Sequence, residues 1–201
     1  MAKLALNKTT LNREGKRLKA YQQFVPALDL KRKQLLAAHQ ESRHALDQFR
    51  MELEGVQSSV KEQIPMLAGS GIELSRLLQV SDLSIKHRNL VGLELPELEK
   101  LELETAAYSH LLLPHWLEPL LALQRTALRC QVEIRISLQR LTLLEEGLQK
   151  TTQRLNLFDK VLIPQAQANM RKIRIALSDA ERAGVVRAKI AKNKRRKLSA
   201  L

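Results

Sequence analysis

The longest regular pattern of apolar positions in this chain runs from residue 138 to residue 177. Leucine recurs there at intervals of seven residues, at Leu141, Leu148, Leu155 and Leu162. Beyond Pro164 the apolar stripe continues to Ile173 and Leu177. A seven-residue repeat places its apolar side chains on one face of an α-helix, and this face winds around a partner helix. The pattern therefore predicts a long helix that needs an equally long partner, from this chain or from another.

A similar pattern predicts a helix from residue 3 to about residue 60. Its apolar residues form three rows with a spacing of seven: Leu4, Leu11, Leu18 and Val25; Tyr21, Leu28 and Leu35; and Leu46, Leu53 and Val60. Because the phase shifts between the rows, we interpret this face as a coiled-coil face with a stutter. Pro26 lies inside this helix and Pro164 inside the C-terminal one. Proline removes a backbone donor, so we expect a bend at each position, or, at Pro26, a split of the helix into two.

The middle of the chain has a different pattern. Helix breakers occur at Ile64-Pro65 and around Gly69 and Gly71, and residues 72–78 are compatible with a short helix. Residues 83–87 and 91–95 then alternate apolar and polar side chains, with Arg88-Asn89 between them. Two alternating runs with a short polar connection predict a small β-hairpin, which Pro96 is expected to end.

From about Pro119 the helical pattern resumes and continues to about Lys192, after which residues 192–197 are expected to fray. We therefore predict an all-α fold, in which the N- and C-terminal helices form a long antiparallel two-helix coiled coil. The predicted parts are an N-terminal coiled-coil helix (1–62), a middle region with a short helix and the β-hairpin (63–118), and a C-terminal helix with a basic tail (119–201). Both termini are expected at one end, so that their basic clusters converge, and the hairpin is expected towards the other end.

Composition agrees with long helices, because aromatic residues make up only 3% of the 201 residues and the chain has seven Gly and six Pro. The net charge of +13 permits nucleic acid, a membrane surface or an acidic protein as a partner. No apolar run approaches the ~20 residues needed to span a bilayer, and the N-terminus lacks the apolar segment of a signal peptide. With Cys130 as the only cysteine, a cytoplasmic location is expected.

No catalytic constellation is visible, and we expect a non-catalytic protein with no cofactor. The chain has no glycine-rich phosphate loop. Its histidines include two pairs five residues apart, which is not the spacing that places two ligands on one helical face, so no metal site is predicted. Cys130 lies in an apolar helical run and is expected to be a buried structural thiol.

Two charged clusters have more than one interpretation. The basic run Lys194–Lys197 is either a solvated helix end or a contact for an acidic protein, and the shortage of aromatic side chains disfavours stacking on bases. The segment from residue 94 to residue 104 is acidic, with Lys100 as its one basic residue. Its acidic residues are Glu94, Glu97, Glu99, Glu102 and Glu104. They form either a solvated loop or hairpin tip, or a docking surface for a basic partner.

Several segments resemble one protein family. These are Asn7–Leu11, Leu28–Leu35, Asn89–Pro96, Arg154–Pro164, Arg171–Arg174 and Arg187–Lys189. In this order and spacing they are similar to the D subunit of V-type (vacuolar or archaeal-type) ATPases and ATP synthases, and the Leu-Asp-Leu-Lys-Arg-Lys form after Pro26 is most like the bacterial branch. The segment that ends at Pro164 is the most specific of them.

The resemblance implies the central rotor shaft of such a complex, which transmits torque between the A/B catalytic hexamer and a membrane ring that moves H⁺ or Na⁺. It implies the hexamer, the F subunit and a funnel-shaped subunit (C or d) as partners. It also implies no direct nucleotide or nucleic acid contact, only indirect membrane association on the cytoplasmic face, and a monomer when isolated.

Four sets of residues are assigned roles, the tip by position along the resemblance, the seam by the seven-residue spacing and the bends by the two prolines. The tip that bears on the hexamer contains Lys8, Leu11, Arg13, Arg17, Arg187, Lys189, Lys192 and Lys194. The coiled-coil seam contains Leu11, Leu18, Leu28, Leu35, Leu141, Leu148, Leu155, Leu162, Ile173 and Leu177. The helix bends are Pro26 and Pro164, and the docking residues of the middle region are Asn89, Gly92, Glu94 and Pro96.

Two other functions are compatible with the residues alone. One is a basic coiled-coil protein that binds nucleic acid through its converged termini, with an affinity that falls steeply with salt. The other is a free-standing coiled-coil scaffold, which forms a homodimer if the long helices pair between chains.

Overall fold

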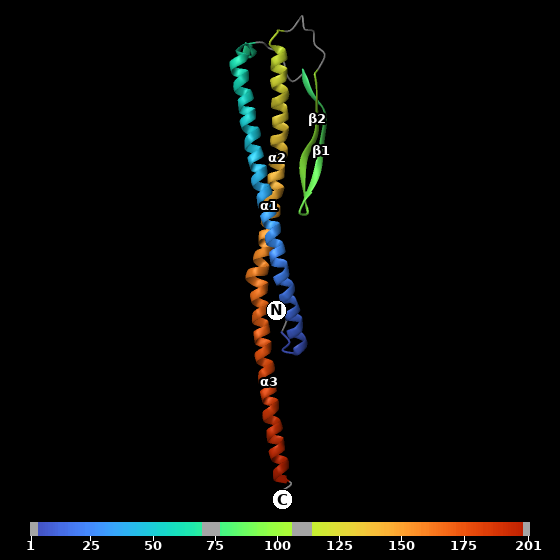
Figure 1. Cartoon of the computed structure of the whole chain (residues 1–201), viewed down its shortest axis with the longest axis vertical. Coiled ribbons are helices and arrows are strands. Elements are labelled where there is room, and N and C mark those ends of the chain that lie inside the picture. The colour runs from blue at the N-terminus through green and yellow to red at the C-terminus, as the bar shows by residue number, and fades with distance from the viewer. Residues whose placement is uncertain (1–3, 70–76, 106–113, 199–201) are drawn as a thin grey trace. The chain divides into compact units, whose positions relative to one another are not determined.

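The computed structural model describes residues 4–69, 77–105 and 114–198. Three long helices are seen in these ranges: α1 (Lys8–Gln63), α2 (Leu117–Leu157) and α3 (Ile163–Leu198). A 3₁₀ helix, η1 (Pro65–Gly69), follows α1, and a π-helical turn, η3 (Phe158–Leu162), joins α2 to α3. The strands β1 (Leu78–Leu90) and β2 (Leu93–Thr105) form an antiparallel hairpin between α1 and α2 in sequence (Figure 1). The predicted fold class, long terminal helices with a hairpin in the middle, is confirmed.

Helix α1 begins at a side-chain cap. The amide N–H of Thr10 donates a 2.7 Å hydrogen bond to Asn7 Oδ1, which satisfies one of the amide donors that the first helical turn leaves without a backbone partner. The helix then continues through Pro26 without a break, so the possibility that this proline splits it is excluded. At the other end of the chain, residues 192–197 belong to α3, whereas the sequence led us to expect fraying there.

The stripe along α1 has no stutter, and this part of the sequence interpretation was wrong. Positions separated alternately by three and four residues are all buried or half-buried: Leu11, Glu14, Leu18, Tyr21, Val25, Leu28, Arg32, Leu35, His39, Ser42, Leu46, Phe49, Leu53, Val56 and Val60. The three rows are therefore alternate positions of one continuous heptad pattern. The pattern looked broken because polar side chains such as Arg32 and Ser42 occupy some of its positions.

The phase shift lies instead in the C-terminal half of the chain. Four buried positions of α2 are seven residues apart: Cys130, Ser137, Leu144 and Thr151. The half-buried Phe158 continues this row, but the next buried residue is Ala166, eight positions later, and Ile173 follows after seven. The π-helical turn η3 accounts for the additional residue, because the N–H of Ile163 donates to the carbonyl of Phe158, five positions earlier.

Pro164 explains why the turn lies where it does. In a regular α-helix its nitrogen would have to donate to the carbonyl of Lys160, and its ring would press against that carbonyl. The wider π-turn that ends at Leu162 relieves this conflict and also moves the apolar stripe by one residue. A bend of the axis at Pro26 or Pro164 stays a prediction.

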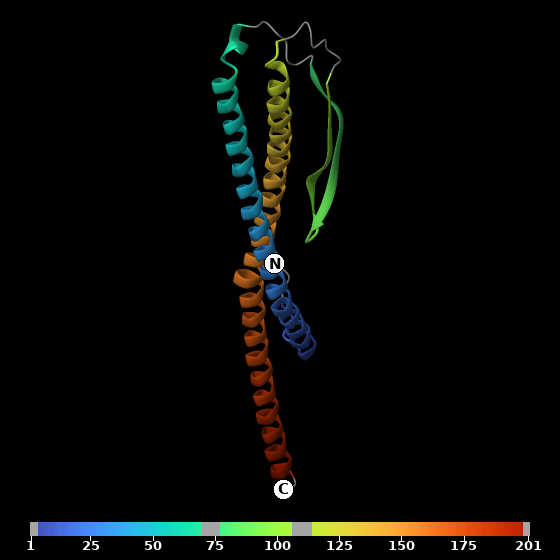
Figure 2. The same cartoon turned by 45° about the horizontal axis from the view of Figure 1, so that its top comes forward.

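The chain divides into two units, Met1–Leu30 with Thr151–Leu201 (the terminal unit) and Lys31–Lys150 (the middle unit). In the terminal unit, α1 and α3 pair antiparallel, as Figures 1 and 2 show. Glu14 Oε2 lies 3.5 Å from Asn169 Nδ2, and the Tyr21 and Phe158 rings meet edge to face with their centroids 5.4 Å apart. Aromatic contact of this geometry adds specificity to apolar burial.

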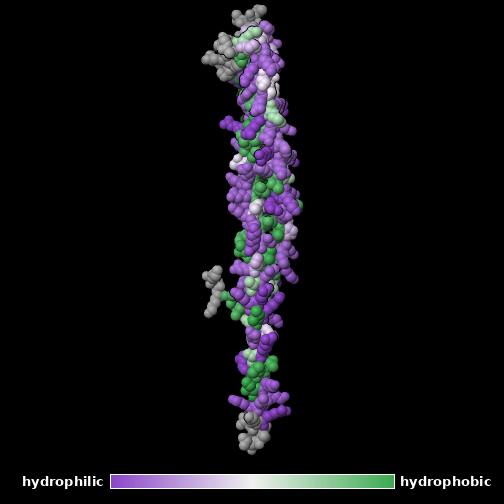
Figure 3. Space-filling model, turned by 90° about the vertical axis from the view of Figure 1, so that its left-hand side faces the viewer, coloured by the Kyte–Doolittle hydropathy of each residue, from purple (hydrophilic) through white to green (hydrophobic). Residues whose placement is uncertain are grey.

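In the middle unit, α1 and α2 also pair antiparallel. Leu35 and Leu144 are fully buried in one cluster, and His39 Nε2 lies 3.3 Å from Glu145 Oε1. Further along, Ile64 packs with Leu117, Leu120 and Leu121. On the face shown in Figure 3, hydrophilic side chains predominate and the hydrophobic patches are small and interrupted.

The hairpin is longer than predicted, and its turn lies three residues later. Leu90 pairs with Leu93, so Val91 and Gly92 form the turn in place of Arg88-Asn89. Pro96 lies within β2, where it pairs with His87, and does not end the hairpin. The predicted short helix over 72–78 falls mostly outside the described residues, and its last residue, Leu78, begins β1.

The turn places a β-branched residue in an unfavourable backbone conformation. Val91 has φ 52° and Gly92 has φ 82°, as in the two-residue turns that prefer Asn-Gly. We expect Val91→Asn to stabilise the chain by about 1 kcal/mol, because asparagine tolerates the left-handed region better than valine. The urea midpoint of unfolding measures this change. Val80→Asn, at an exposed position of β1, is the control and should not raise the midpoint; equal midpoints for Val91→Asn and the parent chain would contradict the expectation.

Candidate interaction surfaces of the C-terminal helix and the hairpin

The last five turns of α3 are exposed on all sides. Every residue from 179 to 196 is exposed, including Val185, Val186 and Ile190, which are more than half exposed. Arg187 donates from Nε to the carbonyl of Ala183 at 3.2 Å, and Lys189, Lys192 and Lys194 are also exposed. The end of α3 is therefore a basic helix with apolar side chains that nothing in the described chain covers.

The N-terminal tip residues differ from one another. Lys8 and Arg13 are exposed, and Leu11 is half-buried. Arg17 already forms an ion pair within α1, because its Nη1 donates a hydrogen bond to Glu14 Oε1 at 2.9 Å. The Glu14 side chain is only 7% exposed. A buried carboxylate at a heptad position needs such partners, since an unpaired one would be strongly destabilising.

The two basic clusters do not converge as predicted. Glu14 lies opposite Asn169, so Lys8, almost two turns earlier in α1, lies level with residues near Ile175. Lys189 follows about 20 Å further along α3 at 1.5 Å per residue. Convergence was expected because the two helices were assumed to end together, whereas α3 continues beyond the start of α1 (Figure 1).

The ten predicted seam residues all lie at buried or half-buried positions. Leu35 and Ile173 are completely buried. The other eight are half-buried: Leu11, Leu18, Leu28, Leu141, Leu148, Leu155, Leu162 and Leu177. Sequence reasoning missed the polar seam residues Glu14, Ser42 and Ser137, which are as buried as many of the leucines. The alternating three- and four-residue spacing was the signal that would have found Glu14 and Ser42.

The acidic residues lie along β2 and not in a loop or at the hairpin tip. Glu94, Glu97, Glu99, Glu102 and Glu104 are all exposed strand residues. Lys100 lies among them, with its Nζ 2.6 Å from Glu102 Oε1 and 3.7 Å from Asp82 Oδ2. The hydrogen bond and the negative charge of Glu102 raise the pKa of Lys100. The hairpin therefore presents a mainly acidic, solvated strand in a basic chain.

The four predicted docking residues lie near the hairpin turn but differ in exposure. Asn89 Oδ1 accepts a 2.9 Å hydrogen bond from the N–H of Gly92, so both residues shape the turn. Glu94 is exposed and Pro96 is buried. Of the four, Asn89, Gly92 and Glu94 are accessible to a partner.

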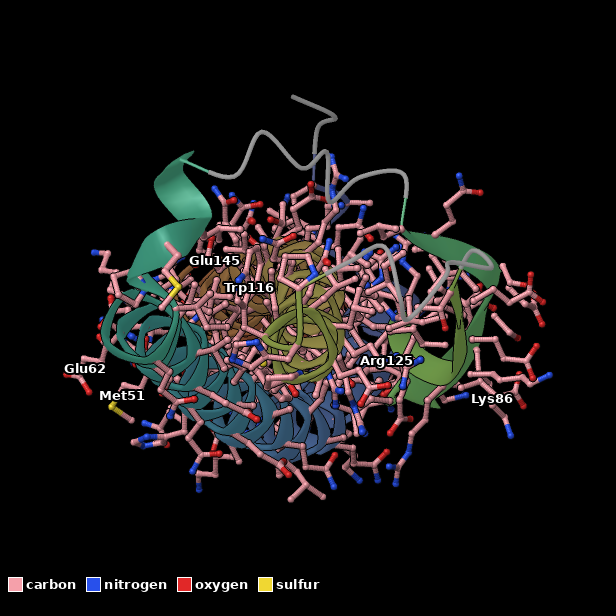
Figure 4. The ribbon with its side chains drawn as sticks, turned by 90° about the horizontal axis from the view of Figure 1, so that it is seen from above. Met51, Glu62, Lys86, Trp116, Arg125 and Glu145 are labelled. Carbon is pink, nitrogen blue, oxygen red and sulfur yellow. The ribbon has the colours of Figure 1, made fainter. Side chains whose placement is uncertain are left out.

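A groove of about 860 Å³ lies between β2 and the helices of the middle unit. Leu98, Leu101 and Leu103 line it from the hairpin, and Phe49 and Cys130 line it from the helices. Arg125 also lines it and donates from Nη2 to Thr105 Oγ1 at 2.9 Å. Figure 4 shows Arg125 directed towards the hairpin and Lys86 directed away from the helices.

Burial changes the ionisation of two residues in this groove. Loss of solvent raises the pKa of the Cys130 thiol, and the nearby Glu52 raises it further, so the thiol stays protonated at neutral pH. Loss of solvent also raises the pKa of Glu133, and the charge of Arg129 opposes this effect. Cys130 is buried, as expected.

Within residues 4–69, 77–105 and 114–198, no group of His, Cys, Asp and Glu has the arrangement of a metal site. In the same ranges, no helix is long and apolar enough to cross a membrane.

Comparison with known proteins matches residues 10–193 to the family described as the D subunit of ATP synthase. The chain is 30% identical to the V-type ATP synthase D subunit of Borreliella burgdorferi, over 96% of this chain and 95% of that protein. It is 30% identical to the protein of the same name from Chlamydia trachomatis, over 96% of both chains. It is 29% identical to the one from Chlamydia pneumoniae, over 94% and 91%. The chain, matched over most of its length, therefore belongs to the D-subunit family of ATP synthases.

Proposed function

We propose that this chain is a non-catalytic subunit of a V-type ATPase or ATP synthase and serves as its central rotor shaft. In this role it transmits torque between the A/B catalytic hexamer and the membrane ring that moves H⁺ or Na⁺. It works on the cytoplasmic side of the membrane, which it reaches only through its partners. Family membership and the names of the similar proteins support the complex.

The single observation that best supports a shaft is the continuous heptad pattern of α1, in which positions from Leu11 to Val60 are all buried or half-buried. A shaft must resist twisting, and two helices that interlock along their whole length resist it better than one helix. The second half of the pattern continues from α2 into α3, with a shift of one residue at the π-turn η3.

The exposed end of α3 is the segment we propose to enter the hexamer. Its cations are exposed and its apolar residues have no cover in the described chain. Exposed ion pairs contribute only ~0–1 kcal/mol each, so a ring of acidic partners can attract this end without holding it in one rotational position. The F subunit and the funnel-shaped subunit are proposed to bind lower on the shaft, near the hairpin.

Reconstitution tests the proposal. The full-length chain is mixed with A/B hexamer and F subunit from the same source, and complex mass and ATP-driven rotation of a bead on the chain are measured. We expect one copy of the chain per hexamer and rotation that depends on ATP. If the chain stays outside the hexamer and shifts DNA, with an affinity that falls steeply as salt rises, the shaft proposal fails and the nucleic-acid function replaces it. A homodimer of the free chain would favour the scaffold function.

A further inference from the structure

The base of the hairpin, where β1 begins and β2 ends, packs against the helices of the middle unit. Leu78, the first residue of β1, is 4% exposed and belongs to the same buried cluster as Ile64 and Leu117. Leu103 of β2 and Trp116 pack against this cluster. Thr105, the last residue of β2, accepts the hydrogen bond from Arg125 of α2. Apolar burial and a polar contact therefore both hold the base.

The tip is fastened by a second, smaller cluster. Leu95 is 2% exposed and is buried with Leu35 of α1 and Leu144 of α2, and Leu90 and Leu93 pack against this group. Since Leu35 and Leu144 are themselves seam residues of the helix pair, the hairpin contributes its three tip leucines to this apolar cluster.

Gly147 of α2 forms a notch for one of these leucines. A Cβ atom at position 147 would collide with Leu93 Cδ1 and would lie 3.3 Å from Leu93 Cγ, inside ordinary contact distance. The Leu93 side chain thus occupies the space that any other residue at position 147 would fill. Gly55 of α1, in the same unit, has no atom within 4 Å of its Cβ position.

Between base and tip the hairpin is packed less closely. The groove lies beneath Leu98 and Leu101, which are half-buried, and every residue of β1 from Gln79 to Asn89 except Ser84 is exposed. At the end of this span, Val91 holds the turn in a left-handed conformation that costs energy. A two-stranded hairpin that is packed at its two ends and exposed between them can release one end while the other stays packed.

We propose that the tip contact is a releasable latch, in which Leu93 leaves the Gly147 notch and the tip leucines lift from the helix pair while the base stays packed. Release exposes Leu90, Leu93 and Leu95 together with the seam residues Leu35 and Leu144. The closed form presents the acidic surface of β2, and the open form adds an apolar surface to it, so that a partner of the hairpin meets different surfaces in the two forms. This holds whether or not the chain is a rotor shaft.

Thiol labelling at the two fastenings tests the latch. In a full-length Cys130→Ala background, Leu95→Cys places a single thiol at the tip and Leu78→Cys places one at the base. Each thiol is reacted with an aromatic disulfide reagent, and its rate is divided by the rate of the same variant in denaturant. Because a buried thiol reacts only through opening, we expect the tip thiol to react roughly tenfold or more faster than the base thiol. Equal normalised rates would overturn the latch, because the hairpin would then open as a whole or not at all.

Gly147→Ala, added to the Leu95→Cys variant, tests whether the contact between Leu93 and Gly147 keeps the tip closed. The added methyl group displaces Leu93, so the labelling rate at the tip should rise several-fold while the rate at the base stays unchanged. Gly55→Ala is the matched control and should leave both rates unchanged. An unaltered tip rate in the Gly147→Ala chain would overturn the assignment of the latch to Leu93 and Gly147. Leu93→Ala provides a check that does not depend on folding of the clashing variant, because the tip rate should rise in that chain also.

Discussion

Deletion of residues 186–201 is expected to reduce ATP turnover coupled to rotation at least tenfold in a complex reconstituted with the A/B hexamer and the F subunit. The deletion removes the basic end of α3, including Arg187, Lys189, Lys192 and Lys194, which is the part proposed to lie inside the hexamer. A factor of ten corresponds to about 1.4 kcal/mol, which a few lost charged contacts supply. ATP turnover and rotation of the same preparation are the measurements.

The deletion should barely change the stability of the isolated chain, because the described residues from 186 to 196 are exposed. Changes at exposed positions of this kind usually alter the free energy of unfolding by no more than about 0.5 kcal/mol. A second chain, with glutamine at all four cationic positions, keeps the helix and loses the charge. If it behaves like the deletion, charge is the important property. A deletion chain with full coupling would contradict the assignment of this segment to the hexamer.

Leu144→Ala is expected to lower the free energy of unfolding by about 3 kcal/mol. Leu144 is completely buried and contacts both the α1 side of the helix pair, through Leu35, and the hairpin tip, through Leu95. A cavity at such a site removes apolar burial on three elements at once, and leucine-to-alanine changes in cores cost about 2–5 kcal/mol. Urea unfolding measures the change as a lower midpoint with an unchanged slope.

The neighbouring residue offers a matched control. Leu143 is 38% exposed and carries the same side chain on the same turn of α2. Leu143→Ala should lower the free energy of unfolding by less than about 1 kcal/mol, since its side chain is already partly in contact with water and its truncation leaves no enclosed cavity. Similar losses of free energy of unfolding at positions 143 and 144 would mean that the pairing face of α2 differs from the one described.

Helix positions and the hairpin were predictable because their signals are local. The seven-residue spacing of leucines in α2, and the alternation around Val91, depend on neighbours within one or two turns of chain. The seam leucines followed from the same periodicity, and residues 10–193 match the family that the sequence segments resembled. The turn was misplaced by three residues because valine is a poor candidate for a positive φ, and only the pairing of Leu90 with Leu93 locates it.

The sequence by itself thus determined two long amphipathic helices, a hairpin between them and membership of the family. The tertiary structure alone decided the register, the continuity of the α1 heptads through Arg32 and His39, and the one-residue phase shift at Phe158–Leu162. It also decided that Gly147 accepts Leu93 and that α3 passes beyond the start of α1. The reason is physical: periodicity is a property of one helix, whereas register and fit depend on contacts such as Glu14 with Asn169, 155 residues apart, that no local pattern encodes.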